Sequence, residues 1–437
     1  MALFFGAWLI RFTLMPSPLV NLIGYAVLLM GIICPLMVLR LKPQLKINIS
    51  MTGLGFILAL YSFEYGLEIN AKLENSRMLN EKNHTVDLLE KLKIEEKRPS
   101  IPIGTLTLLS GINGNVNDGI KTEKGEIVPL SNSSFEATFL CENSNGPVIF
   151  KSDRYGFNNL DLVWNSSSME VAVLGDSYVE GACVKPDKNI TSEIMKAIPA
   201  TLNLGIVGHG PLTMLGTINE YLKYKQPKTV IWCYSANDIY PNLAMEKDNK
   251  ILMQYLNQEF NQKLIERQAE IDQVVKTFIA KKSEGLTQNT NIDLKDQRLF
   301  LKNLSNSKFL KLYRLRQIVF RPILTKFNSD YDLFDKVIKS AKTAVNSWEG
   351  KIIFVYLPGP ERFYRNQEDP AKERVLKIIK ENGLAIIDME EVFFKEPDPK
   401  LFYENAQSHY NEKGYQFVSA TILKAVTRVQ WPVTSDQ

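Results

Sequence analysis

The chain has 437 residues, of which 45% are hydrophobic and 23% charged, and its formal net charge is +4. This composition excludes a chain that is disordered throughout and a strongly basic surface that coats nucleic acid, so no nucleic-acid partner is expected. The four cysteines include no C-x-x-C pair, which argues against a disulfide-rich scaffold and a zinc site, and we expect neither a metal nor another cofactor.

The N-terminal part of the chain, residues 1–65, has the composition of a membrane anchor. Residues 19–39 form a run of 21 residues without a charged side chain, which as a helix crosses the roughly 30 Å hydrocarbon layer of a bilayer. A second uncharged run at residues 47–63 is near the short limit of about 17 residues, and we predict a second transmembrane helix there. The loop between the two runs holds three basic residues and no acid, so we expect it to be cytoplasmic and the rest of the chain to be extracytoplasmic.

Two further segments separate this anchor from the main domain. Residues 66–100 are highly charged and mostly helix-forming, which predicts a helical stalk, and His84 in this stalk is not expected to be catalytic. Residues 101–169 are rich in Gly, Asn and Ser with short β-type runs at 105–109 and 135–140. We predict a small strand-and-turn segment there, called the lead-in segment below.

From residue 170 to the C-terminus, short apolar runs alternate with helical patterns, which predicts a parallel sheet with helices on both faces. The predicted strands are residues 171–174, 201–204, 229–234, 351–356 and 384–387. The predicted helices are residues 191–197, 213–224, 371–381 and 412–428. In such sheets the functional residues gather at the carboxyl ends of the strands.

An insertion at residues 242–350 separates the third and fourth predicted strands. Its first half repeats apolar residues at helical spacing, which predicts a long helix over residues 252–264. In its second half, residues 297–329 contain eight basic residues and no acidic one, interleaved with apolar residues. This basic segment suits the surface of an anionic bilayer, a helix packed on its own domain with a solvated basic face, or an anionic polysaccharide.

Polar motifs follow the predicted strands in a fixed order. Residues 175–177 (Gly-Asp-Ser) end the first strand, Gly208 follows the second, and residues 235–238 (Ser-Ala-Asn-Asp) end the third. Residues 409–414 (His-Tyr-Asn-Glu-Lys-Gly) precede the last helix. In this order the motifs resemble the four blocks of the SGNH, or GDSL-type, hydrolase superfamily, with the insertion set aside.

The resemblance covers about residues 171–426, and residues 153–158 (Asp-Arg-Tyr-Gly-Phe-Asn) are similar to the segment that precedes the domain in membrane-anchored members. It implies a flavodoxin-like α/β three-layer sandwich with a five-stranded parallel sheet, here preceded by N-terminal transmembrane helices. It also implies chemistry on acyl esters.

The resemblance gives each motif a role that its chemistry supports. A serine hydroxyl becomes nucleophilic when a neighbouring base takes its proton, and histidine suits that task near neutral pH, so Ser177 and His409 are the expected pair. Attack on an ester puts negative charge on oxygen, which needs fixed donors. The expected oxyanion donors are the backbone N–H groups of Ser177 and Gly208 and the side-chain amide of Asn237.

One departure concerns the acid. Family members usually have an acid three residues before the histidine, where this chain has Ala406. The candidates for orienting His409 in its place are Asp176, Glu404 and Asn405, and a backbone carbonyl is the alternative.

Other polar residues near the motifs have less definite roles. Ser235 stands where the third block usually has Gly, and it either narrows the pocket or adds a hydroxyl to it. His209 follows the proposed oxyanion glycine, and we expect it to be a pocket-wall or structural residue. Cys141 and Cys183 are expected to be free thiols, with a disulfide as the alternative if the domain is exported.

The sequence therefore predicts a membrane-anchored serine esterase or O-acyltransferase, with an extracytoplasmic domain acting on acyl esters such as those of envelope glycans or lipids. Its expected partners are the ester substrate and the bilayer, the latter through the N-terminal helices and the basic segment. The rival hypothesis is a lapsed module that keeps the fold and binds acylated glycan or a membrane partner. Retention of Ser177, Asn237 and His409 together favours catalysis.

Overall fold

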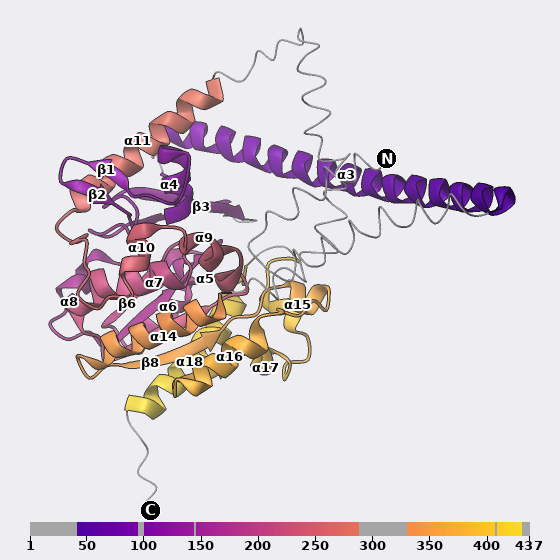
Figure 1. The fold of residues 1–437 in the computed structure, drawn as a ribbon. Helices are drawn as coiled ribbons and strands as arrows, with labels where there is room; N and C mark the ends of the chain where they lie inside the picture. The colour runs from indigo at the N-terminus through magenta and orange to yellow at the C-terminus, as the bar shows by residue number, and fades with distance from the viewer. Residues whose placement is uncertain (1–41, 95–99, 144–145, 288–329, 407–408, 431–437) are drawn as a thin grey trace, which may run out of the picture. The chain divides into compact units, whose positions relative to one another are not determined.

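The computed structural model describes residues 42–94, 100–143, 146–287, 330–406 and 409–430 (Figure 1). Two sequence predictions lie outside the described residues: the transmembrane helix at 19–39 and the basic segment at 297–329. The first described element is α3 (Pro43–Ile94), a single helix of 52 residues. By length and composition, Pro43–Ile69 is able to cross a membrane, and it is the one helix of this kind in the described part of the chain.

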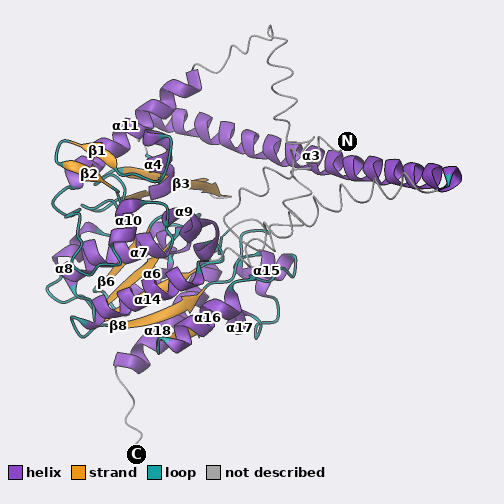
Figure 2. Cartoon of the chain, viewed as in Figure 1, coloured by secondary structure: helices purple, strands orange, loops and turns teal. Residues whose placement is uncertain are grey.

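The main domain contains the predicted parallel sheet, so the predicted α/β fold class is confirmed (Figure 2). The strand order is β6-β5-β7-β8-β9 and every neighbouring pair is parallel. The strands are β5 (Val171–Gly175), β6 (Thr201–Gly205), β7 (Thr229–Tyr234), β8 (Lys351–Tyr356) and β9 (Ala385–Asp388). Because β6 and β7 lie on opposite sides of β5, the chain reverses its direction of winding next to β5, which is where such sheets bind ligands.

Alternating side chains of the strands enter two separate cores, one on each face of the sheet. In β5, Ala172 and Leu174 belong to one core and Val171 and Val173 to the other. The first core is covered by α7 (Pro211–Thr217), α14 (Tyr331–Asn346) and α16 (Lys372–Glu381). The second is covered by α5 (Ser177–Glu180), α6 (Ile190–Met195), α17 (Met389–Phe393) and α18 (Glu412–Gln430). The sheet is thus the middle layer of a three-layer sandwich.

Shorter helical elements connect the strands and helices of these layers. They are η2 (Pro186–Lys188), η3 (Ile218–Leu222), α8 (Lys223–Lys225), α15 (Glu361–Tyr364) and η5 (Pro399–Phe402).

Most of the lead-in segment packs on the first core, whereas the buried residues of its hairpin (Phe139, Val148 and Phe150) are not part of that core. Its elements are α4 (Thr105–Asn113), β1 (Ile120–Thr122), β2 (Gly125–Ile127), β3 (Ala137–Asn143), β4 (Gly146–Lys151) and η1 (Asp161–Asn165). The strand predicted at residues 135–140 corresponds to β3, but the strand predicted at 105–109 was wrong. Those residues begin α4, whose Leu106, Leu108 and Leu109 are buried in the shared core and whose last turn is closed by Gly114 in the left-handed conformation.

The insertion also differs from its prediction, because no long helix spans residues 252–264. The insertion begins with η4 (Asp238–Leu243), α9 (Ala244–Glu246), α10 (Lys250–Gln254) and α11 (Gln268–Thr287). After α10 the chain turns, and the buried carboxylate of Glu220 accepts hydrogen bonds from the backbone N–H groups of Gln262 and Leu264. These bonds satisfy backbone donors that a helix would satisfy internally, so the apolar residues are buried without helical structure.

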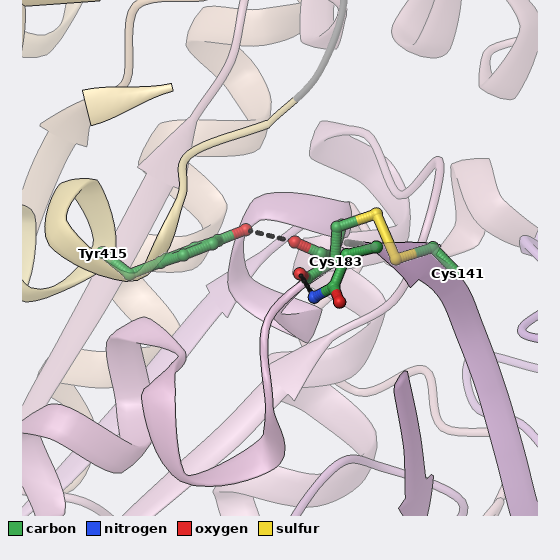
Figure 3. The surroundings of a disulfide bond; sticks show 5 residues. Cys141, Cys183 and Tyr415 are labelled. Atoms are coloured by element: carbon green, nitrogen blue, oxygen red, sulfur yellow. Dashed lines mark hydrogen bonds between the residues drawn. A yellow bond between two sulfur atoms is a disulfide. The ribbon is translucent and has the colours of Figure 1, made fainter. Parts of the chain in front are cut away.

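A disulfide joins the lead-in segment to the main domain (Figure 3). It links Cys141 in β3 to Cys183, just after α5, with 5.4 Å between the Cα atoms. Tyr415 from α18 donates a hydrogen bond to the carbonyl of Ala182, beside this bridge. The expectation that both cysteines are free thiols was therefore wrong, whereas Cys233 is a free, buried thiol.

Replacing both Cys141 and Cys183 by serine is expected to lower the free energy of unfolding by about 2–4 kcal/mol, because the bridge restricts the unfolded chain across a separation of 42 residues. Urea unfolding of the wild type and the double variant measures the difference. Wild-type protein unfolded in the presence of a reductant should behave like the variant. Overlapping curves for the oxidised wild type and the variant would contradict the expectation.

Candidate active site

Ser177 is positioned by the turn that ends β5. A Cβ on Gly175 would lie 2.5 Å from a methyl group of Val179, so glycine lets the chain turn tightly into α5. Asp176 caps this short helix, because its Oδ1 accepts a hydrogen bond from the backbone N–H of Tyr178. Ser177 is the first residue of α5 and its side chain is half-buried at the carboxyl edge of the sheet.

His409 approaches Ser177 from the other end of the domain. The Nε2 atom of His409 lies 2.8 Å from the Oγ atom of Ser177, across a sequence separation of 232 residues. The approach of the chain to α18 is fixed by Asn411, whose amide donates to the carbonyl of Tyr403 and whose Oδ1 accepts from the N–H of Gly414. A Cβ on Gly414 would lie 2.1 Å from the carbonyl of Phe402, so this close approach requires glycine. These contacts give a physical reason for the His-x-Asn-x-x-Gly pattern.

The surroundings of His409 keep the imidazole neutral. Burial lowers its pKa below the ordinary value, while the charges of Asp176 and Glu361 act in the opposite direction. A neutral imidazole with Nε2 facing a hydroxyl is able to accept the serine proton.

Asp176 belongs to a buried polar group beside Ser177. Its Oδ2 accepts a hydrogen bond of 2.8 Å from the hydroxyl of Ser235, which also lies 3.3 Å from Oδ1 of Asp238. Burial raises the pKa of Asp238 well above its ordinary range, and the nearby charge of Asp176 raises it further. Ser235 is buried, so its hydroxyl supports the two aspartates instead of narrowing or lining a pocket.

The three candidate oxyanion donors lie at the ends of adjacent strands. Gly208 has φ of +71°, and a Cβ there would meet nothing within 4 Å, so this residue faces open space in a conformation that favours glycine. Within the described residues, the N–H groups of Ser177 and Gly208 make no hydrogen bond. Asn237 is exposed, and its side-chain amide has no hydrogen-bond partner in the same part of the chain.

Glu180 supports the Gly208 turn, and the sequence analysis missed it. It lies three residues after Ser177 in α5 and is 2% exposed. Its Oε2 accepts a hydrogen bond of 3.0 Å from the N–H of Val207, directly before Gly208, so one side chain ties the nucleophile helix to the proposed oxyanion turn. Burial raises the pKa of Glu180 to about 8, so it is mostly protonated at neutral pH. The sequence feature that could have indicated this role is an acidic residue in an otherwise apolar, buried turn of helix.

His209 directly follows Gly208, and its ring contacts the lead-in segment. It is fully buried, and its Nε2 lies 3.2 Å from the hydroxyl oxygen of Thr105 in α4. The Thr105 hydroxyl donates its proton to the carbonyl of Pro129, so Nε2 of His209 is the donor to Thr105. Burial lowers the pKa of His209 to about 3, which makes it a neutral structural histidine.

The lead-in segment and the start of the insertion both brace the Gly208 turn. A Cβ on Gly104 would lie 2.4 Å from the carbonyl oxygen of Val207, so the lead-in backbone presses against the turn. From the insertion, Asn242 donates to the carbonyl of His209, and Glu246 accepts hydrogen bonds from the N–H groups that begin α7. The turn is held from both sides.

Among the residues that the structure describes, none is an acid hydrogen-bonded to the ring of His409. Ala406 is half-buried, and the contact described between His409 and Glu404 is a backbone hydrogen bond from the N–H of Glu404 to the carbonyl of His409. Glu404 and Asn405 are exposed. Asp176 accepts its described hydrogen bonds from Tyr178 and Ser235, and it acts on His409 through its charge, which raises the pKa of the imidazole.

No protein-family model and no curated protein sequence matches this chain. Among solved structures, a lipase/acylhydrolase from Enterococcus faecalis is 14% identical and the match covers 59% of this chain and 95% of that one, with a TM-score of 0.33. A GDSL-like lipase from Bacteroides thetaiotaomicron is 14% identical over 60% and 88%, with a TM-score of 0.32. An acetylxylan esterase from Geobacillus stearothermophilus is 12% identical over 60% and 95%, with a TM-score of 0.32. These values assign no activity to this chain.

Replacing Glu180 by glutamine is expected to stabilise the protein at pH 8 relative to the wild type, and this advantage should shrink toward pH 4.5. The pKa of Glu180 is raised by burial from its ordinary 4.5 to about 8, so the folded state keeps a proton that the unfolded chain loses between these values. Stability from this group is therefore present below pH 4.5 and lost as the pH rises toward 8. Urea unfolding across this range measures it.

The matched control is Glu180→Ala, which leaves the Val207 N–H without its acceptor. Relative to Glu180→Gln it should be less stable by about 1–3 kcal/mol at every pH, because a buried donor is left unpaired. A glutamine variant whose stability relative to the wild type does not change with pH would show that Glu180 is ionised in the folded protein.

Proposed function

We propose that this chain is an SGNH-type serine esterase or O-acyltransferase in which Ser177 is the nucleophile and His409 the general base. The observation that supports this most directly is the 2.8 Å contact between the Ser177 hydroxyl and Nε2 of a neutral His409. The order of the sequence motifs and the placement of Ser177, Gly208 and Asn237 after three adjacent strands agree with this proposal.

In the proposed reaction, Oγ of Ser177 attacks the carbonyl carbon of an acyl ester while its proton moves to Nε2 of His409. The carbonyl oxygen becomes an oxyanion, which the N–H groups of Ser177 and Gly208 and the amide of Asn237 stabilise. His409 then gives its proton to the departing alcohol, which leaves an acyl group on Ser177. Water releases the acid in an esterase, whereas an acceptor hydroxyl takes the acyl group in an acyltransferase.

The proposed setting is the outer face of a membrane. The apolar part of α3, Pro43–Ile69, would anchor the chain in the bilayer, together with the run at residues 19–39. The Cys141–Cys183 disulfide supports an extracytoplasmic domain, because such bonds persist in oxidising compartments. In this setting the substrate would be an acyl ester of an envelope glycan or a lipid, with the basic segment at 297–329 as a further bilayer contact.

The second candidate function is a lapsed module that binds acylated glycan or a membrane partner. The observation in its favour is Ala406, which leaves His409 without the acid that usually precedes it. Binding would then use the exposed carboxyl edge of the sheet without turnover.

Ser177→Ala and His409→Ala are each expected to abolish hydrolysis of p-nitrophenyl acetate by the detergent-solubilised chain, because each removes one partner of the proton transfer. Asn237→Ala should lower kcat by about 10²–10³-fold through the loss of one oxyanion donor. Steady-state kinetics and labelling of Ser177 by a fluorophosphonate measure these effects. No turnover and no labelling of the wild type would favour the binding module.

A membrane-impermeant protease added to right-side-out vesicles is expected to digest the α/β domain, because the domain should lie outside. Vesicles opened with detergent, with a known cytoplasmic protein as marker, control for leakage. Digestion of the α/β domain only after opening would place it in the cytoplasm and contradict the proposed location.

A further inference from the structure

The proposed mechanism leaves one charge without a described counterpart. When His409 takes the serine proton, the imidazole becomes positive in a largely buried site. Among the described residues, the hydrogen-bond partner of its ring is Ser177, through Nε2. A triad of this type normally places an acid opposite the other ring nitrogen, where it orients the ring and stabilises the imidazolium.

The segment after β8 lies directly against the loop that carries His409. Tyr403 and Tyr410, which flank this loop and pair with each other through a β-bridge, both donate hydrogen bonds to the carbonyl of Pro358. Their distances to that oxygen are 2.7 and 3.0 Å. Three residues later, Glu361 begins α15. Two buried hydroxyls thus fix the start of the Glu361 segment to the base of the His409 loop.

The carboxylate of Glu361 lies beside Gly359, near the hydroxyl of Tyr178. A Cβ placed on Gly359 would lie 2.5 Å from Oε2 of Glu361 and 3.9 Å from the hydroxyl of Tyr178, so both groups lie within 4 Å of one point. The ring of Tyr178 in turn packs against the ring of His409, with 4.7 Å between centroids. The absence of a side chain at Gly359 leaves room for the carboxylate to turn this way.

Glu361 is also an acid without another partner. Its carboxylate makes no hydrogen bond or ion pair with the described residues. The adjacent Arg362 instead pairs with Glu390 at 3.0 Å and with Glu368 at 3.5 Å. The side chain of Glu361 is exposed and can change rotamer without breaking a described contact.

We propose that Glu361, in the segment after β8, is the positioning acid for His409. It replaces the acid that SGNH members usually have at the position of Ala406. This inference rests on the proposed serine mechanism. Glu361 orients the imidazole and stabilises the positive charge that forms as Nε2 accepts the Ser177 proton. No atom is transferred to Glu361 itself, since its effect on the reaction is electrostatic.

The electrostatics of the site agree with this geometry. The groups that face His409 are Asp176 and Tyr178 from the β5–α5 turn and Glu361 from the β8–α15 turn. Burial lowers the pKa of His409, and the charges of Asp176 and then Glu361 raise it. Asp176 accepts hydrogen bonds from the N–H of Tyr178 and the hydroxyl of Ser235, and burial raises its pKa. Glu361 is exposed, and its carboxylate has no hydrogen bond or ion pair with the described residues.

Histidine NMR titration of the full-length chain in detergent micelles tests the proposal, with His409 assigned by a His409→Gln variant. Glu361→Gln is expected to lower the pKa of His409 by about half a pH unit or more, because a nearby negative charge is lost. Glu361→Asp should stay closer to the wild type. An unchanged His409 titration in Glu361→Gln would overturn the proposal.

Two matched variants separate this effect from a general loss of negative charge. Glu368→Gln removes an exposed acid nearby in sequence and should leave the His409 titration as in the wild type. Glu404→Gln removes the acid closest to His409 along its own loop. A shift in Glu404→Gln equal to or larger than that in Glu361→Gln would assign the role to Glu404 and overturn the proposal.

The kinetic measurement then connects Glu361 to turnover. In Glu361→Gln, kcat/KM for p-nitrophenyl acetate is expected to fall about tenfold or more, with the rising limb of its pH profile moved to lower pH and the thermal unfolding unchanged. Turnover by the variant equal to that of an active wild type would overturn the inference alone. A wild type without turnover or phosphonate labelling would instead overturn the proposed function, and the titration would still report whether Glu361 acts on His409.

Discussion

The parallel register of β5 with its neighbours is the constraint on which the candidate site depends. Gly175 pairs with Gly205, and Leu174 lies opposite Trp232, so the chain leaves the sheet at nearly the same level in three adjacent strands. Residues that follow these strands therefore meet at one edge without any long side chain reaching across. The edge is extended by β8, whose final residue Tyr356 pairs with Tyr234 of β7. His409 is the exception, because it reaches the edge from a loop that precedes α18.

Behind this edge the protein uses buried acids mainly as hydrogen-bonding groups. Burial raises the pKa of Asp176, Glu180, Asp238 and Glu246, which lie beneath the nucleophile or beside the Gly208 turn. Each carboxyl group accepts hydrogen bonds from backbone or hydroxyl donors, which lie in the turns after the strands or in the first turn of a helix. A full set of negative charges there would oppose the oxyanion of the proposed reaction. The upward pKa shifts disfavour the charged carboxylates, which is the direction that reduces this opposition.

The sheet was predictable because its strands are short, continuous apolar runs, which are buried in β5, β6, β7 and nearly all of β8 and partly exposed in the edge strand β9. The predicted bounds at 229–234 and 351–356 coincide with β7 and β8. Elements whose structure depends on distant partners were not predictable: α4 needs the core of the main domain, and the turns after α10 need the carboxylate of Glu220. The motif residues were found through their order along the chain. Glu180 and Glu361 were not, because their relation to the Val207 turn and to His409 exists only after folding.

The smallest fragment that we expect to fold on its own begins with the lead-in segment and not with β5. Gly104 presses on the Gly208 turn, the Thr105 hydroxyl accepts a hydrogen bond from His209, and Cys141 is covalently bonded to the loop behind Ser177. A fragment that began at β5 would expose one face of the core and release the Gly208 turn on one side. Homologous domains grafted or exchanged at that strand would therefore inherit the motif residues without the scaffold that orients them. Recombination between such proteins should be tolerated before residue 100 and not between residues 100 and 170.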